Sequence, residues 1–307
     1  MSRHFLGIST TPTEDLTSIY RLAMKNYDGT ELAQRGVSLI FEKPSLRTKA
    51  SSLCAIEQLG GRVAVFTQAE IGLDVRESAE DVARTLAATS SIIAARVFDH
   101  SKFERMISAT GDRVSYVNLL SDYSHPAQAI ADVLALAEHF TKGKVKDLKG
   151  LTLAYVGDAT NVTRSLASAL TRLGAHVRVG APNEYQLSSY DVTLINTLAE
   201  HGGTLSLFST AEKAVEGADA IYTDSWISMG FEAEAEVRRS HLAAFQVNRQ
   251  LLDLAKPGVA ILHCLPAHRG EEISDEVLDN ENSLIWSQVH HRTTAMRGIL
   301  RWIVGKK

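Results

Sequence analysis

Short apolar runs alternate along the chain with stretches in which apolar residues recur at helical spacing. Most of these runs are apolar at nearly every position, as in strands that are buried on both faces. They cover Val37–Phe41, Arg62–Phe66, Ile92–Val97, Leu151–Val156, His176–Val179, Ala220–Thr223 and Val259–Leu262. Helical patterns end at Gln58 and extend over Ser78–Ser90 and Pro126–Phe140. The alternation predicts an α/β fold built from doubly wound parallel sheets.

A segment rich in lysine and glycine, Thr141–Gly150, divides this pattern into two halves of similar length. We therefore predict two α/β domains, residues 1–141 and residues 150–288, with a cleft between them. The last helical pattern, at about residues 289–307, is expected to pack back on the first domain. In doubly wound sheets ligands bind beyond the carboxyl ends of the strands, so residues that directly follow a strand are the candidates for function.

Composition narrows the class of protein. The 307 residues are 45% hydrophobic and carry 32 Lys+Arg against 36 Asp+Glu, a formal net charge of −4. The normal apolar content excludes a disordered chain. The slight acidic excess argues against a nucleic-acid partner, because proteins that bind nucleic acids usually carry an excess of basic residues. Two cysteines, Cys54 and Cys264, build no disulfide framework, and we see neither a secretory signal nor an apolar membrane segment. We expect a cytoplasmic enzyme.

The first candidate motif is Phe41–Lys49, where a predicted strand gives way to a helix. Ser45 and Thr48 supply hydroxyl groups, Arg47 supplies a guanidinium fork, and the helix start supplies backbone N–H groups without helical partners. Such a set can hold a phosphate group. The alternative is an ordinary helix cap followed by one solvated arginine.

Polar residues also lie near the end of the run Ile92–Val97 and in the segment Ser121–Gln128, which follows the apolar residues around Val117. Arg96 closes an otherwise small and apolar strand, and His125 and Gln128 stand at the start of the next helix. Arg96 alone can be an edge charge, and His125 with the proline after it can be a capping turn. Cationic and hydrogen-bonding groups that converge at one sheet edge nevertheless suit a small phosphorylated ligand.

The second half carries three more strand-end motifs. Val156–Asn161 resembles the opening of a dinucleotide fold but lacks its second and third glycines, so binding of NAD is disfavoured. Its Asn161 can cap a helix or point into the cleft, and Asp224 can recognise an amine or close a turn. The loop His263–Gly270 holds two histidines and one cysteine, which do not form a standard zinc site. We expect no metal and no cofactor.

These motifs, in this order, resemble the aspartate/ornithine carbamoyltransferase family, and the resemblance extends over nearly the whole chain. Phe41–Lys49 is similar to the family motif FEKPSTRTR, while Ser228–Gly230 and His263–Gly270 are similar to marks of its ornithine branch. The resemblance implies an N-terminal carbamoyl-phosphate domain, a C-terminal ornithine domain, and synthesis of citrulline and phosphate in arginine biosynthesis. It also implies a homotrimer or a multiple of trimers.

The resemblance also implies roles for individual residues. The positions that match contacts to carbamoyl phosphate are Ser45, Leu46, Arg47, Thr48, Arg96, His125, Gln128, Cys264, Leu265 and Arg292. The positions that match contacts to ornithine are Asn161, Asp224, Ser228, Met229 and Cys264. Among them, the resemblance places Arg47, Arg96, His125 and Cys264 in catalysis.

The chain departs from the family pattern at a few positions. Leu46 replaces a threonine, Lys49 an arginine and Ala127 a cysteine, and the loop around Gly72 lacks a Gln or His side chain that reaches a neighbouring subunit in the family. Two alternatives follow from these departures. One is a carbamoyltransferase for a related amine, and the other is an inactive paralogue that only binds a ligand or a partner.

Overall fold

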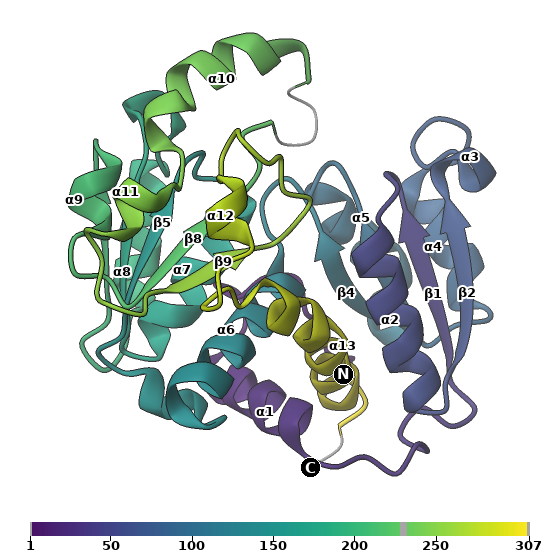
Figure 1. Cartoon of the computed structure of the whole chain (residues 1–307). Helices are drawn as coiled ribbons and strands as arrows, with labels where there is room; N and C mark the ends of the chain where they lie inside the picture. Colours follow the sequence, from purple (N-terminus) through teal and green to yellow (C-terminus); the bar gives the residue numbers. More distant parts are fainter. Residues whose placement is uncertain (1, 228–231, 306–307) are drawn as a thin grey trace. The chain divides into compact units, whose positions relative to one another are not determined.

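The computed structural model describes residues 2–227 and 232–305. The chain divides into two compact units, residues 1–131 with 290–307 and residues 132–289. Each unit holds one sheet of parallel strands covered by helices, which confirms the predicted α/β class (Figure 1).

The first unit is built around a sheet of strand order β2-β1-β3-β4. Its elements in chain order are α1 Thr13–Met24, β1 Gly36–Phe41, α2 Leu46–Gln58, β2 Arg62–Thr67, α3 Gln68–Ile71, α4 Ala79–Ala87, β3 Ile92–Arg96, α5 Ser101–Thr110 and β4 Ser115–Leu120. The crossover from β1 to β2 runs opposite to the crossovers that follow. Because parallel crossovers are right-handed, α2 covers one face of the sheet, and α4 and α5 cover the other.

The second unit is built around a sheet of order β7-β6-β5-β8-β9. Its elements are β5 Thr152–Val156, α7 Asn161–Arg172, β6 His176–Gly180, α8 Ser189–Leu198, β7 Thr204–Phe208, α9 Ala211–Val215, β8 Ala220–Thr223, α10 Ala235–Leu242, α11 Arg249–Leu252, β9 Ala260–His263 and α12 Asp275–Leu278. The same handedness places α7 and α8 on one face and α9 and α11 on the other. An apolar cluster that includes Ala154, Ala214 and Ile261 fills this second layer.

The division between the units falls within two helices, α6 Pro126–Thr141 and α13 Ile285–Ile303. The C-terminal part of α13 packs on α1 inside the first unit. A Cβ atom at Gly298 would lie 2.6 Å from the carbonyl oxygen of Ile19, so only glycine permits this close approach of the two helices. Arg301 donates to the carbonyl oxygen of Leu22 at 2.6 Å and fastens the last turn.

The strand β7 was missed by the sequence analysis. Thr204, Ser206 and Leu207 are exposed at this edge of the sheet, so the segment has no continuous apolar run. The helices of the described residues include none with the length and apolar character that a membrane span requires.

Candidate active site

The first group of candidate residues follows β1 and β3, the two strands between which the strand order of the first sheet reverses. Phe41 and Arg96 are register partners, so both strands end at the same level. The pairing of β3 with β4 shifts between Ala95 and Arg96, and such irregularities re-aim side chains at the rim of a sheet. Ligands bind at this kind of reversal in doubly wound folds.

The start of α2 provides donors for an anion. Ser45 occupies the N-cap position with extended backbone, but its side chain makes no capping hydrogen bond. The N–H groups of Leu46, Arg47 and Thr48 belong to the first helical turn and therefore have no partner within the helix. The Leu46 side chain is 79% exposed, so this residue offers its backbone rather than its side chain. The helix start favours negative charge.

Three buried side chains of the first unit are joined by hydrogen bonds. Arg292 of α13 donates through Nη2 to the Thr48 hydroxyl oxygen at 2.7 Å, and through Nη1 to Oε1 of Gln128 on α6. Since the Thr48 oxygen accepts from Arg292, its own O–H hydrogen points elsewhere. The structure thus brings together Thr48, Gln128 and Arg292, three of the positions that match contacts to carbamoyl phosphate in the resemblance.

His125 directly precedes α6 and is buried among cations. Burial lowers the pKa of its imidazole well below the usual 6.5, and Arg292, Arg96 and Arg47 lower it further. The imidazole is therefore neutral at pH 7 and keeps one N–H donor and one acceptor. The site in the first unit combines this neutral ring with guanidinium groups from three separate elements.

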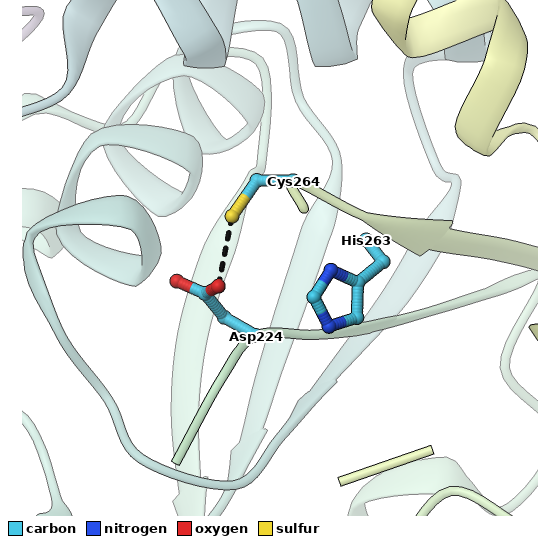
Figure 2. A group of neighbouring side chains, drawn as sticks. All are labelled: Asp224, His263 and Cys264. Atoms are coloured by element: carbon cyan, nitrogen blue, oxygen red, sulfur yellow. Dashed lines mark hydrogen bonds between the residues drawn. The ribbon is translucent and has the colours of Figure 1, made fainter. Parts of the chain in front are cut away.

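The second group of candidates lies at the ends of β8 and β9. Thr223 and His263 are register partners, so the next residue of each strand, Asp224 and Cys264, leaves the sheet side by side. The Cys264 Sγ donates to Oδ1 of Asp224 at 2.8 Å (Figure 2). The backbone N–H of Ser225 donates to the same oxygen, also at 2.8 Å.

The environment of Asp224 leaves its charge only partly compensated. Burial raises the pKa of this carboxyl group, and nearby Glu272 raises it further. His263, the Cys264 thiol and the Ser225 N–H lower the pKa but do not offset burial. A cationic group that binds beside Asp224 would supply the missing compensation.

Asn161 begins α7, directly beyond the turn that follows β5. Thr160, rather than Asn161, caps this helix, because its hydroxyl accepts from the N–H of Val162 at 3.4 Å. Gly157 in the same turn has a φ of +116°, which favours glycine. Val156 is the register partner of Thr223, so Asn161 and Asp224 follow neighbouring strand ends. Ser228 and Met229, the other ornithine candidates, lie outside the described residues.

Ligand-type atoms of Asp224, His263 and Cys264 lie within 4.8 Å of one another (Figure 2). Both ring nitrogens of His263 are nevertheless engaged. Nδ1 accepts from the N–H of Leu265 at 2.8 Å, so Nε2 carries the hydrogen and faces Oε1 of Glu272 at 3.1 Å. A metal bound by all three residues would require His263 to give up one of these buried bonds. The three residues fit a hydrogen-bonded substrate site better than a metal site.

Leu265 adopts a φ of 60°, an unusual conformation for a bulky residue, directly after Cys264. Cys264 and Leu265 both belong to the second unit, whereas the other candidates for carbamoyl-phosphate binding belong to the first.

One supporting residue, Glu42, was missed by the sequence analysis. Its buried carboxylate accepts from the N–H of Phe98 at 2.7 Å and from Nζ of Lys102 at 2.5 Å. These bonds tie the turn after β1 to the segment after β3, the two segments that carry the candidate anion-binding residues. The sequence did hold a signal for Glu42, because a charged residue directly follows an apolar strand and precedes a candidate binding turn.

Two family models match the chain. Residues 3–138 match the carbamoyl-P binding domain of aspartate/ornithine carbamoyltransferase, and residues 149–303 match its Asp/Orn binding domain. Together they cover most of the sequence.

Individual relatives agree with these matches. The chain is 42% identical to the anabolic ornithine carbamoyltransferase of Pyrococcus furiosus, over 89% of this chain and 85% of that protein. It is 40% identical to the ornithine carbamoyltransferase of Hyperthermus butylicus, over 98% and 97% of the two chains. A solved structure of the Pyrococcus furiosus ornithine carbamoyltransferase superposes with a TM-score of 0.91 at 38% identity, covering 99% of this chain and 97% of that chain.

The burial of His125 predicts a pH effect on stability. The unfolded chain binds a proton on this residue near pH 6.5, whereas the folded chain resists protonation, so acidification favours unfolding. Between pH 7 and pH 5 the free energy of unfolding of wild type should fall more steeply than that of His125→Gln, by at most about 1.4 kcal/mol per pH unit. Urea denaturation across this range measures the difference.

The exposed His201→Gln variant is the control for this experiment and should keep the wild-type slope. Equal slopes for wild type and His125→Gln would contradict a buried neutral imidazole.

Proposed function

The chain belongs to the aspartate/ornithine carbamoyltransferase family, and on that premise we propose that it transfers the carbamoyl group of carbamoyl phosphate to the δ-amine of L-ornithine. The products are citrulline and phosphate. The observation that carries the proposal is the Asp224–Cys264 pair at the end of the second sheet, where the described residues offset the burial of the Asp224 carboxylate only in part. It has the chemistry to recognise an amino acid's ammonium group.

The proposed carbamoyl-phosphate site is built mainly from residues of the first unit. Arg47 and the Ser45 hydroxyl bind the phosphate, together with the N–H groups of Leu46 and Thr48 at the start of α2. Gln128 orients Arg292 and Arg292 adds positive charge. A guanidinium fork suits the phosphate oxygens because it donates two parallel hydrogen bonds.

The carbamoyl oxygen gains negative charge when the amine attacks. Thr48, Arg96 and His125 are the proposed donors to that oxygen. The O–H of Thr48 is directed away from Arg292, and His125 is neutral with an N–H to donate. Donors that are fixed before the reaction stabilise the developing charge without reorganisation.

In the transfer step the neutral Nδ of ornithine forms a bond to the carbamoyl carbon. The bond from that carbon to the phosphate oxygen then breaks, and the phosphate leaves with the electron pair. The departing phosphate accepts the proton that the amine releases, so the step requires no separate protein base. Cys264 orients the amine and forms no covalent intermediate, because the amine attacks directly.

Ornithine is proposed to bind through its α-groups. Asp224 holds the α-ammonium group and Asn161 binds the α-carboxylate, which leaves the δ-amine as the reactive end. Cys264 and Leu265 contact both substrates, while Ser228 and Met229 complete the ornithine site.

We further propose a cytoplasmic, anabolic enzyme that assembles as a homotrimer or a multiple of trimers. The anabolic relative supports the direction of the reaction, and the free thiols of Cys54 and Cys264 fit a reducing compartment. Val75, 85% exposed at the tip of a loop anchored by the ion pair of Asp74 and Arg105 at 2.8 Å, supports a contact with another copy. Gly72 closes α3 in the left-handed conformation, which explains the glycine there. The mass in solution tests the assembly.

A substrate profile tests the proposed activity. With carbamoyl phosphate as donor, we expect carbamoylation of ornithine and little or no carbamoylation of N-acetylornithine, putrescine or aspartate. N-acetylornithine lacks the α-ammonium group, and putrescine lacks both α-groups that Asp224 and Asn161 would hold. A preference for one of these amines would support the related-amine alternative, and a folded protein without turnover would support the inactive one.

Arg47→Ala should weaken carbamoyl-phosphate binding by about 10-fold or more, because a charge-assisted contact to phosphate is lost. Calorimetric titration of the folded variant measures the change. Arg62→Ala removes an exposed arginine of the same unit and should bind like wild type. Unchanged affinity in Arg47→Ala would remove this residue from the site.

Asp224→Asn should lower kcat/KM for ornithine by about 30-fold or more, since the shape is kept while a partly buried charge is lost. Carbamoyl-phosphate binding should change much less. Steady-state kinetics with each substrate varied in turn measures both effects. Asp253→Asn, which removes an exposed carboxylate of the same unit, is the matched control. Normal ornithine kinetics in Asp224→Asn would overturn the assignment.

A further inference from the structure

The buried carboxyl group of Asp132 has no role in the reaction proposed above. It lies on α6 within the second unit, and its side chain is fully shielded from solvent. The Tyr222 hydroxyl donates to its Oδ2 at 3.2 Å, and Nε2 of Gln288 donates to its Oδ1 at 2.8 Å. Burial of a carboxylate costs free energy that hydrogen bonds only partly offset, so its presence calls for a reason.

Asp132 fixes the orientation of the Gln288 amide. Nε2 of Gln288 donates to Oδ1 of Asp132, so the amide turns its NH₂ group toward this carboxyl group. Its oxygen therefore faces the other way, where it accepts from the backbone N–H of His263 at 3.0 Å. In the reverse orientation the amide oxygen of Gln288 would face the Asp132 oxygen, so two acceptors would meet. Its NH₂ group would face the backbone N–H of His263, so two donors would meet.

Tyr222 and Gln288, the partners of Asp132 described above, connect it to the ends of the two strands that carry the candidate ornithine site. Tyr222 lies on β8 two residues before Asp224, and His263 is the residue of β9 directly before Cys264. Tyr222 and Leu262 are register partners in the same ladder. The side chain of His263 is held separately by Glu272, so the link through Gln288 acts on its backbone.

We propose that Asp132, acting through Gln288 and Tyr222, is a positioning residue that sets the relative placement of Asp224 and Cys264. The 2.8 Å contact between these two side chains depends on where β8 and β9 end. Asp132 bonds to Tyr222 of β8 directly and to the backbone of β9 through Gln288, and it touches neither Asp224 nor Cys264 in the described contacts. This inference rests on the proposed function, because its readout is the use of ornithine.

A swap of the two side chains tests the orientation argument. Gln288→Glu places a second carboxylate against Asp132 and breaks the pattern of donors and acceptors. Adding Asp132→Asn restores the pattern, because the asparagine NH₂ donates to the introduced carboxylate while its oxygen accepts from Tyr222. Asp132→Asn alone keeps its oxygen toward Gln288 and its NH₂ toward the Tyr222 oxygen. Ser287→Ala, the control, removes a bond from the adjacent residue of α13 to Glu138 of α6 at 2.8 Å.

We expect Gln288→Glu to raise the KM for ornithine by about 10-fold or more, because a buried polar contact is broken. The double variant should return to within about 3-fold of Asp132→Asn, which itself should show only a small rise. Ser287→Ala should match wild type. The dissociation constant of carbamoyl phosphate, measured by calorimetry, should change much less than the KM for ornithine in all four variants, because most of the proposed contacts to carbamoyl phosphate belong to the first unit. Melting temperatures recorded in parallel report the folded state.

A lower melting temperature in Gln288→Glu with an unchanged KM for ornithine would overturn the proposal, because it would show a purely structural role. Failure of the double variant to recover its KM while it folds like Asp132→Asn would also overturn it. If Gln288→Glu does not fold, Tyr222→Phe removes one donor to Asp132, and its KM for ornithine should rise several-fold. An unchanged KM there would count against the proposal. Absence of ornithine turnover in wild type would instead overturn the proposed function.

Discussion

Parallel pairing in register is the constraint on which both candidate sites depend. It ends β1 and β3 at the same level in one unit, and it ends β8 and β9 at the same level in the other. Because the strands end at the same level, the side chains that directly follow them lie close together. A slip of one residue between β8 and β9 would turn Cys264 to the other face of the sheet and separate it from Asp224.

Buried polar bonds hold these strand ends in place. Glu42 ties the turn after β1 to the segment after β3, and Gln288 holds the backbone of β9 just before Cys264. Each of these polar groups is buried away from water. Its burial costs little free energy only when hydrogen bonds within the protein replace those with water. The chemistry of the sites then follows from charges that are only partly compensated. Guanidinium groups lie near a neutral His125, and the described residues offset the burial of Asp224 only in part. The first environment therefore suits an anionic ligand, and the second suits a cationic group.

The strands and the motifs that follow them were predictable because apolar runs and turn residues are local signals. The helix of Leu46–Gln58 and the buried β8 agree with the pattern, whereas the edge strand β7 has too little apolar content to be recognised. The hydrogen bond between Thr48 and Arg292, 244 residues apart, was beyond any spacing argument, and only the family resemblance singled out both residues. Asp132 stood within a helical pattern and Gln288 just before the last one, both as ordinary polar residues, and only the folded chain pairs them.

The central claim is that the α-groups of ornithine are held so that only its δ-amine reacts. Carbamoyl phosphate labelled with ¹³C and ornithine labelled with ¹⁵N at the δ position test this claim in a single NMR spectrum of the product. The account predicts one-bond coupling between the labelled carbon and the labelled nitrogen in all of the product that forms. A labelled carbamoyl carbon without this coupling, as after transfer to the α-amine, would contradict it.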